Sequence, residues 1–170
     1  MIVGKRTSQD LTSKVLVIGV GNMFRSDDAA GYIVAHSLNA RALPETTIIE
    51  ESGEGAVLME SWKDVEAVVL VDAVSSGGKP GTVHRFDAHN DVIPSRFFRY
   101  STHAFSVAEA VELARVMKRL PSKMIIYGIE GKNFQAGVGL SPEVQQSVPT
   151  VIQSIIQDVE SFTAKGSMHA

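Results

Sequence analysis

The chain of 170 residues contains no cysteine. This absence excludes a disulfide framework, a thiolate zinc site, an iron–sulfur cluster and a cysteine nucleophile. An excess of positive charge is also absent, because the net charge is −3 and the basic residues are scattered. No global basic field therefore attracts nucleic acid or anionic lipid, and we expect neither as a partner.

Long hydrophobic runs are missing as well. The longest, at residues 65–74, is interrupted by Glu66 and Asp72 and is too short to span a bilayer. Residues 1–13 are polar and lack the apolar centre of a secretory signal. We predict a cytoplasmic monomer with one domain at residues 14–164 and flexible termini at residues 1–13 and 165–170.

Strand-like and helix-like patterns alternate along the chain. Short β-branched or apolar runs predict strands at residues 14–20, 46–50, 66–72, 82–86 and 124–129. Apolar stripes at helical spacing predict helices at residues 27–40, 56–62, 106–118 and 142–162. Ser106 and Glu109 form a capping-box signature at the start of the third helix.

This order of elements predicts the fold class. Strands separated by helices indicate an α/β three-layer sandwich around a mostly parallel, twisted sheet of five strands flanked by helices. The link between the third and fourth strands is too short for a crossover helix. We therefore expect the fourth strand to be antiparallel and to lie at an edge.

Three polar side chains follow predicted strands: Asp28, Asp72 and His103. In open α/β sheets, functional sites gather beyond the carboxyl ends of the strands, so we expect these side chains to converge. Two carboxylates and an imidazole suit a divalent ion such as nickel, zinc or manganese. Three protein ligands also leave coordination positions open, as an exchanging or catalytic site requires.

Each of these residues also has a structural explanation. Asp27 and Asp28 open a predicted helix, where acidic side chains complement the helix dipole. Asp72 precedes a Ser- and Gly-rich segment and fits a turn, while His103 fits a loop. Only the expected convergence on one rim favours the functional interpretation.

The glycine-rich loop after the first strand does not match a nucleotide-binding motif. Gly19 and Gly21 are followed by Phe24 where the dinucleotide fingerprint needs its third glycine. A phosphate-binding P-loop, a serine nucleophile elbow and a zinc-protease helix motif are also absent from the sequence. A nucleotide-handling enzyme is therefore disfavoured.

Several motifs occur in one order over about residues 14–160, and together they resemble the hydrogenase maturation proteases. They lie at residues 19–31 (G-V-G-N-x-x-x-x-D-D-x-x-G), 71–74 (V-D-A-V), 78–83 (G-x-P-G-T-V), 101–103 (S-x-H), 128–130 (G-I-E) and 137–144 (G-x-G-L-S-P-E-V). The resemblance implies a five-stranded sheet flanked by helices. It also implies an endopeptidase that removes the C-terminal peptide of a nickel–iron hydrogenase large-subunit precursor once nickel is in place.

The resemblance assigns Asp28, Asp72 and His103 as the nickel-binding and catalytic residues. The nickel is expected to come with the precursor, which is the expected partner, and ions such as zinc or cadmium are expected to occupy the same site in vitro. The metal would position the scissile carbonyl or act as a Lewis acid. Alternatively, Asp28 or Asp72 would be a general base for water.

The motifs also indicate substrate-binding positions and departures from the family pattern. Phe24 stands where the family favours an aliphatic residue, and Ala29 where it favours glycine. After the second strand, residues 51–55 replace an aspartate followed by glycines, which makes Glu51 a candidate for the substrate cleft. The expected substrate-binding residues are Gly21, Asn22, Asp27, Glu51 and Gly53. The remaining alternative is a non-catalytic module that binds a metal or another ligand.

Overall fold

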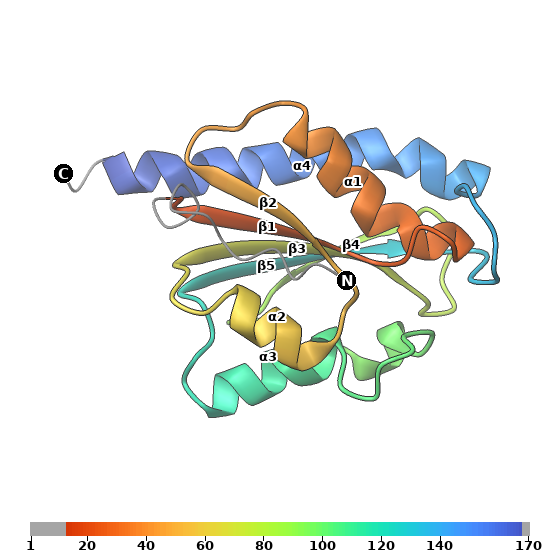
Figure 1. The fold of residues 1–170 in the computed structure, drawn as a ribbon, viewed down its shortest axis with the longest axis horizontal. Coiled ribbons are helices and arrows are strands. Elements are labelled where there is room, and N and C mark those ends of the chain that lie inside the picture. The colour runs from red at the N-terminus through yellow and green to blue at the C-terminus, as the bar shows by residue number, and fades with distance from the viewer. Residues whose placement is uncertain (1–12, 168–170) are drawn as a thin grey trace.

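The computed structural model describes residues 13–167 and contains one five-stranded sheet (Figure 1). Its strand order is β2-β1-β3-β5-β4. All neighbouring strands are parallel except β4 and β5, which are antiparallel. The predicted sheet and its antiparallel edge strand are therefore confirmed. The strands are β1 (Val15–Val20), β2 (Thr46–Glu51), β3 (Ala67–Val74), β4 (Val83–Asp87) and β5 (Lys123–Glu130).

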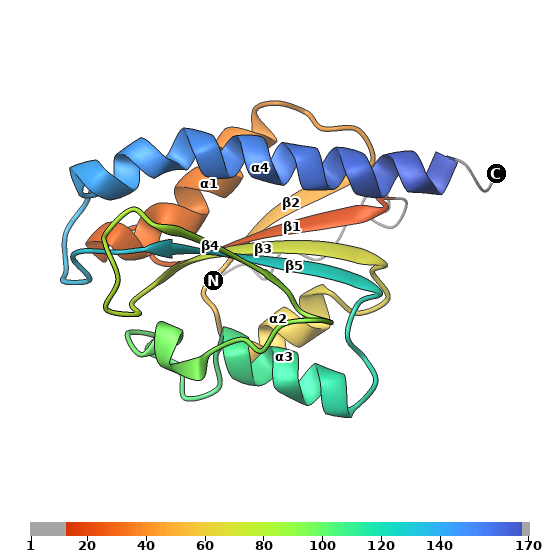
Figure 2. The ribbon, with the colours of Figure 1, turned by 180° about the vertical axis from the view of Figure 1, so that it is seen from behind.

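Helices cover both faces of the sheet, so the predicted three-layer architecture is also confirmed. Figures 1 and 2 show α1 and α4 on one face and α2 and α3 on the other. The helices are α1 (Ala30–Asn39), α2 (Gly55–Ser61), α3 (Val107–Val116) and α4 (Pro142–Ser167).

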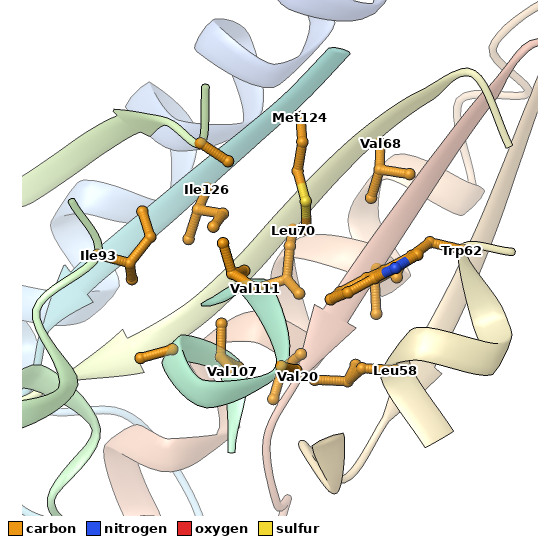
Figure 3. Close-up of a cluster of buried hydrophobic side chains, with 14 of the residues drawn as sticks. Val20, Leu58, Trp62, Val68, Leu70, Ile93, Val107, Val111, Met124 and Ile126 are labelled. Atoms are coloured by element: carbon orange, nitrogen blue, oxygen red, sulfur yellow. The ribbon is translucent and has the colours of Figure 1, made fainter. Parts of the chain in front are cut away.

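Two hydrophobic cores separate the layers. Side chains alternate between the faces of a strand, so Leu70 of β3 packs toward α2 and α3, whereas Val69 packs toward α1 and α4. In the first core, Leu58 and Trp62 from the α2 segment lie on the same side of the sheet as Val107 and Val111 of α3 (Figure 3). Burial on both faces explains why β1 and β3 are almost continuously apolar.

The segment before α1 departs from the prediction. We expected one helix over residues 27–40, but Ser26–Ala29 form a 3-10 turn and α1 begins at Ala30. Ser26 has a left-handed backbone with φ 53°, and its N–H donates to Gly137 O at 3.0 Å. Backbone pairing with a distant loop thus overrides the helical tendency at this point.

A close approach fixes the position of α1. A Cβ atom on Gly31 would lie 2.1 Å from the carbonyl oxygen of Val20 and 2.5 Å from that of Val71. Only glycine allows the first turn of α1 to rest directly on the ends of β1 and β3. This contact brings the aspartates at 27 and 28 to the carboxyl edge of the sheet.

Two further segments position the site. The predicted capping box is confirmed, because the Glu109 carboxylate accepts hydrogen bonds from Ser106 N–H at 3.2 Å and Ser106 Oγ at 2.6 Å. A short 3-10 turn at Ser95–Phe98, which the sequence did not predict, precedes this helix. Together they fix both ends of the loop that carries His103.

The structure extends the predicted domain slightly at its C-terminal side. Helix α4 continues through Ser167, three residues past the predicted domain end at residue 164. Residues 1–12 and 168–170 lie outside the described residues, and their predicted flexibility stays a prediction. Over residues 13–167, no helix is both long enough and apolar enough to cross a membrane.

Candidate active site

A cavity of about 330 Å³ opens at the carboxyl ends of the parallel strands. Its lining includes Asp28, Asp72 and His103, so the structure brings together the three side chains that the sequence expected to converge. They come from the 3-10 turn before α1, from β3 and from the loop before α3. The cavity therefore lies where ligand sites of open α/β sheets are found.

Asp72 is the most deeply placed of the three. It is 7 % exposed and shares the α2–α3 face of the sheet with Leu70 and Val74. Burial raises the pKa of its carboxyl well above the usual range, and the negative charge of Asp28 adds to this rise. The backbone N–H of Ala73 opposes it only in part. A carboxyl with a raised pKa is suited to exchanging a proton with a reacting group.

Asp28 is half-buried beside it. Burial raises the pKa of the Asp28 carboxyl, while the nearby positive charges of Arg25 and His103 lower it in part. No hydrogen bond holds the Asp28 side chain among the described residues, so its oxygens remain available to a ligand or a water molecule. Asp28 and Asp72 thus form a pair of interacting carboxyls.

His103 lines the same cavity from a loop that has its own hydrogen bonds. Its backbone N–H donates to Ser101 Oγ at 3.2 Å. Two residues further on, Phe105 O accepts a hydrogen bond from Gly55 N–H at 2.8 Å, which ties the loop to the start of α2. The imidazole therefore belongs to a short segment that is hydrogen-bonded to the start of α2 and leads directly into α3.

The donor set fits a borderline divalent ion, since it combines carboxylate oxygens with an imidazole nitrogen. In the conformation described, no three His, Asp or Glu side chains within residues 13–167 are arranged as a ready-made metal site. Asp28, Asp72 and His103 share a cavity, and joint ligation would need their side chains to turn toward one another.

Tyr32 also lines the cavity, although the sequence analysis did not predict it as a site residue. It lies four residues after Asp28, one helical turn further along, which is the signal that could have found it. Burial and the negative charges of Glu50, Glu51 and Asp28 raise the pKa of its phenol. Tyr32 therefore keeps its proton and offers an uncharged hydroxyl donor in an acidic cavity.

Three of the five predicted substrate-binding residues line this cavity: Gly21, Asn22 and Gly53. Gly53 has a left-handed backbone with φ 93°, and a Cβ atom there would lie 2.9 Å from Val20 Cγ1. A side chain at this position would strain the backbone and crowd the end of β1. The loop after β2 thus forms a smooth wall of the cavity.

Asp27, which was also predicted to contact substrate, has a structural role in the fold, and its predicted contact with substrate stays a prediction. Its side chain is 0 % exposed. Its Oδ2 accepts hydrogen bonds from the backbone N–H groups of Lys132 at 2.8 Å and Asn133 at 2.9 Å, and its Oδ1 accepts one from Ser141 N–H at 2.7 Å. The Ser141 hydroxyl donates as well. Asp27 therefore holds the loop at residues 131–141 and does not face the cavity.

Glu51 also falls outside the residues that line the cavity. It ends β2 half-buried, and its Oε1 accepts a hydrogen bond from Ser61 Oγ at 3.2 Å. Burial raises the pKa of this carboxyl, and the Ser61 hydrogen bond lowers it in part. Glu51 thus makes a contact between β2 and α2 and has an electrostatic influence on Tyr32, while its substrate-binding role stays a prediction.

A model of a known protein family matches most of the chain. The model described as HycI, hydrogenase maturation protease, matches residues 32–158. The chain belongs to the hydrogenase maturation protease family. As a member of this family it is an endopeptidase, which confirms the predicted enzyme class.

Individual relatives agree with the family assignment. The chain is 29% identical over 155 residues to a putative hydrogenase maturation protease of Methanocaldococcus jannaschii, with 86% of this chain and 96% of that protein covered. It is 25% identical over 147 residues to the hydrogenase 2 maturation protease of Escherichia coli, with coverages of 84% and 88%.

Solved structures show the same fold. The hydrogenase maturating endopeptidase HybD from E. coli superposes with a TM-score of 0.71 at 20% identity, covering 87% of this chain and 93% of that one. The solution structure of an endopeptidase from Escherichia coli superposes with a TM-score of 0.73 at 25% identity, with coverages of 84% and 89%. The maturation protease therefore shares its architecture with these two endopeptidases.

Proposed function

We propose that this maturation protease removes the C-terminal extension of a nickel–iron hydrogenase large-subunit precursor and recognises the nickel that the precursor carries. The observation that supports this most is the shared cavity of Asp28, Asp72 and His103 at the carboxyl edge of the sheet. Two oxygen donors and one nitrogen donor suit nickel, and the chain has no thiolate that could compete.

In this proposal nickel is part of the substrate. The three side chains engage the metal from the enzyme side, which holds the scissile bond over the carboxyl pair. A carboxyl with a raised pKa is suited to take the proton of an attacking water, so Asp28 and Asp72 are both candidates for general base. Nickel supplies charge that polarises groups near it.

The test uses purified enzyme with two forms of the precursor from the same organism, nickel-loaded and nickel-free. We expect mass spectrometry to detect a shortened product only with the nickel-loaded form. Equal cleavage of both forms would rule out recognition of nickel. No cleavage of either would rule out the assigned substrate.

A variant tests the site itself. His103→Ala removes the imidazole from a half-buried loop position, so the fold should be retained. We expect cleavage of the nickel-loaded precursor to be lost, with an unchanged circular dichroism spectrum. Full processing by this variant would show that the imidazole takes no part. Zinc and cadmium, which we expect to bind the same cavity, should inhibit cleavage in competition with the precursor.

A further inference from the structure

Exposed apolar side chains gather at the mouth of the active-site cavity. Among the described residues, eight large hydrophobic side chains are exposed, and three of them line this cavity: Met23, Phe24 and Tyr100. Phe24 is 75 % exposed and Tyr100 is 47 % exposed. When a partner covers an aromatic side chain that is exposed to water at a cavity mouth, the burial stabilises the complex.

The mouth also carries an aromatic stack. The rings of Tyr100 and Phe134 lie 4.8 Å apart with an interplanar angle of 8°. Phe134 also lines the cavity, although it comes from the loop after β5 and is distant in sequence from Tyr100. Two loops therefore combine to form one apolar part of the cavity lining.

Hydrogen bonds hold these loops in place. Arg25 Nε donates to the carbonyl oxygen of Phe134 at 3.0 Å, and the same guanidinium donates to the carbonyl oxygen of Tyr100. Gly137 N–H donates to the carbonyl oxygen of Phe24 at 2.9 Å. The backbone that carries each aromatic ring is thus fixed before any partner arrives, which lowers the entropy cost of binding.

We propose that Met23, Phe24, Tyr100 and Phe134 form an apolar clamp that grips a bulky apolar side chain of the precursor close to the bond that is cleaved. The inference rests on the proposed function, since it takes the cavity of Asp28 and Asp72 as the place of cleavage. It goes further by assigning a specificity surface and the kind of residue that it selects.

The surroundings of the clamp identify its occupant. The clamp residues line the same cavity as Asp28 and Asp72, so a polypeptide that reaches the two carboxyls lies next to them. The two carboxyls disfavour an acidic side chain at this place. An extended segment with a large apolar residue matches both the acidic floor and the aromatic walls.

The experiment measures the Kd of nickel-loaded precursor by rapid mixing, in the interval before cleavage. Phe24→Ala removes an exposed ring, so the fold is not at risk. We expect its Kd to rise about tenfold, and Phe24→Leu to recover most of the affinity. Met117→Ala is the matched control, because Met117 is 44 % exposed just after α3 and does not line the cavity. Its Kd should stay at the wild-type value.

Substitutions in the precursor give the second arm. Each bulky apolar residue within about four positions of the cleaved bond is changed to alanine in turn. We expect one of these changes to weaken binding to the wild-type enzyme about tenfold and to leave binding to Phe24→Ala unchanged. Strictly additive effects, or equal Kd values for wild type and Phe24→Ala, would overturn the clamp.

The outcomes distinguish failure of the proposed function from failure of the clamp. They also distinguish the precursor from a second copy of this chain as the partner that covers the exposed rings. Failure of the wild type to shorten nickel-loaded precursor overturns the proposed function, whereas equal Kd values overturn the clamp alone. If the exposed rings instead join two copies of this chain, sedimentation will show a dimer that Phe24→Ala dissociates. That result, with an unchanged precursor Kd, would also reject the clamp.

Discussion

Asp27 and Asp28 are neighbours in the chain and have opposite surroundings. Asp27 is fully buried and accepts hydrogen bonds from three backbone N–H groups and one hydroxyl. Asp28 lines the cavity beside Asp72, and burial raises the pKa of its carboxyl. A carboxylate that is surrounded by donors is a structural anchor, whereas one that faces a cavity beside another carboxyl is available for chemistry.

Asp28→Asn should have the largest effect and should act on catalysis. The amide can serve neither as a general base nor as an anionic ligand, so we expect cleavage of nickel-loaded precursor to fall by about 10²–10⁴-fold. The free energy of unfolding should stay the same or rise, because the substitution removes a charge whose partial burial destabilises the folded state. Single-turnover cleavage and urea denaturation measure the two quantities. A loss of stability in proportion to activity would contradict this distinction.

Asp27→Asn should act on stability. The amide NH₂ would face backbone N–H groups that now donate to a carboxylate oxygen, which leaves buried donors without acceptors. We expect a loss of about 2–4 kcal/mol in the free energy of unfolding. Urea denaturation at constant pH measures this loss. Full stability combined with lost cleavage would return Asp27 to the substrate-binding set.

The pH dependence of stability should distinguish Asp72 from an ordinary carboxyl. Because burial raises its folded-state pKa, the folded protein binds this proton more tightly than the unfolded chain does. The resulting stabilisation is fully present below the usual carboxyl pKa of about 4 and is lost as the pH rises through the raised folded-state pKa. Asp72→Asn has no such titration.

We therefore expect the stability of Asp72→Asn relative to wild type to increase as the pH rises above about 4. Denaturant unfolding of both proteins at a series of pH values provides the measurement. A constant difference between wild type and Asp72→Asn would mean that the pKa of Asp72 is not raised.

Tyr32→Phe should give the smallest effect, because it removes one hydroxyl and keeps the ring. If this hydroxyl donates to the reacting group beside Asp28, we expect kcat to fall about tenfold with little change in KM. Tyr100→Phe is the matched control, since Tyr100 stacks on Phe134 through its ring. Equal effects of the two substitutions would mean that the Tyr32 hydroxyl has no special role.

Much of the fold followed from local patterns. The five strands were predictable because β-branched runs alternate with helical stripes, and the antiparallel β4 because its connection to β3 is short. The meeting of Asp28, Asp72 and His103 was predictable because parallel strands end at one edge. The roles of these residues, the monomeric state and the cytoplasmic location stay predictions.

The features that escaped prediction depend on contacts between distant segments. The role of Asp27 is set by donors at residues 132, 133 and 141, which no local pattern connects to it. The 3-10 turn at Ser26–Ala29 exists because Ser26 pairs with Gly137, while local propensity favours a continuous helix. The wall formed by Tyr100 and Phe134 likewise joins two loops that only the folded chain brings together.

The carboxylate of Asp27 also has a consequence for motion. Because one buried group joins the turn before α1 to both ends of the loop at residues 131–141, neither segment can detach alone without leaving donors unpaired. The two should therefore open as one cooperative unit, and their protected amides should exchange with solvent deuterium at a common rate. The same local unfolding would then determine how often the segments that carry Phe24 and Phe134 move and widen the entrance to the cavity.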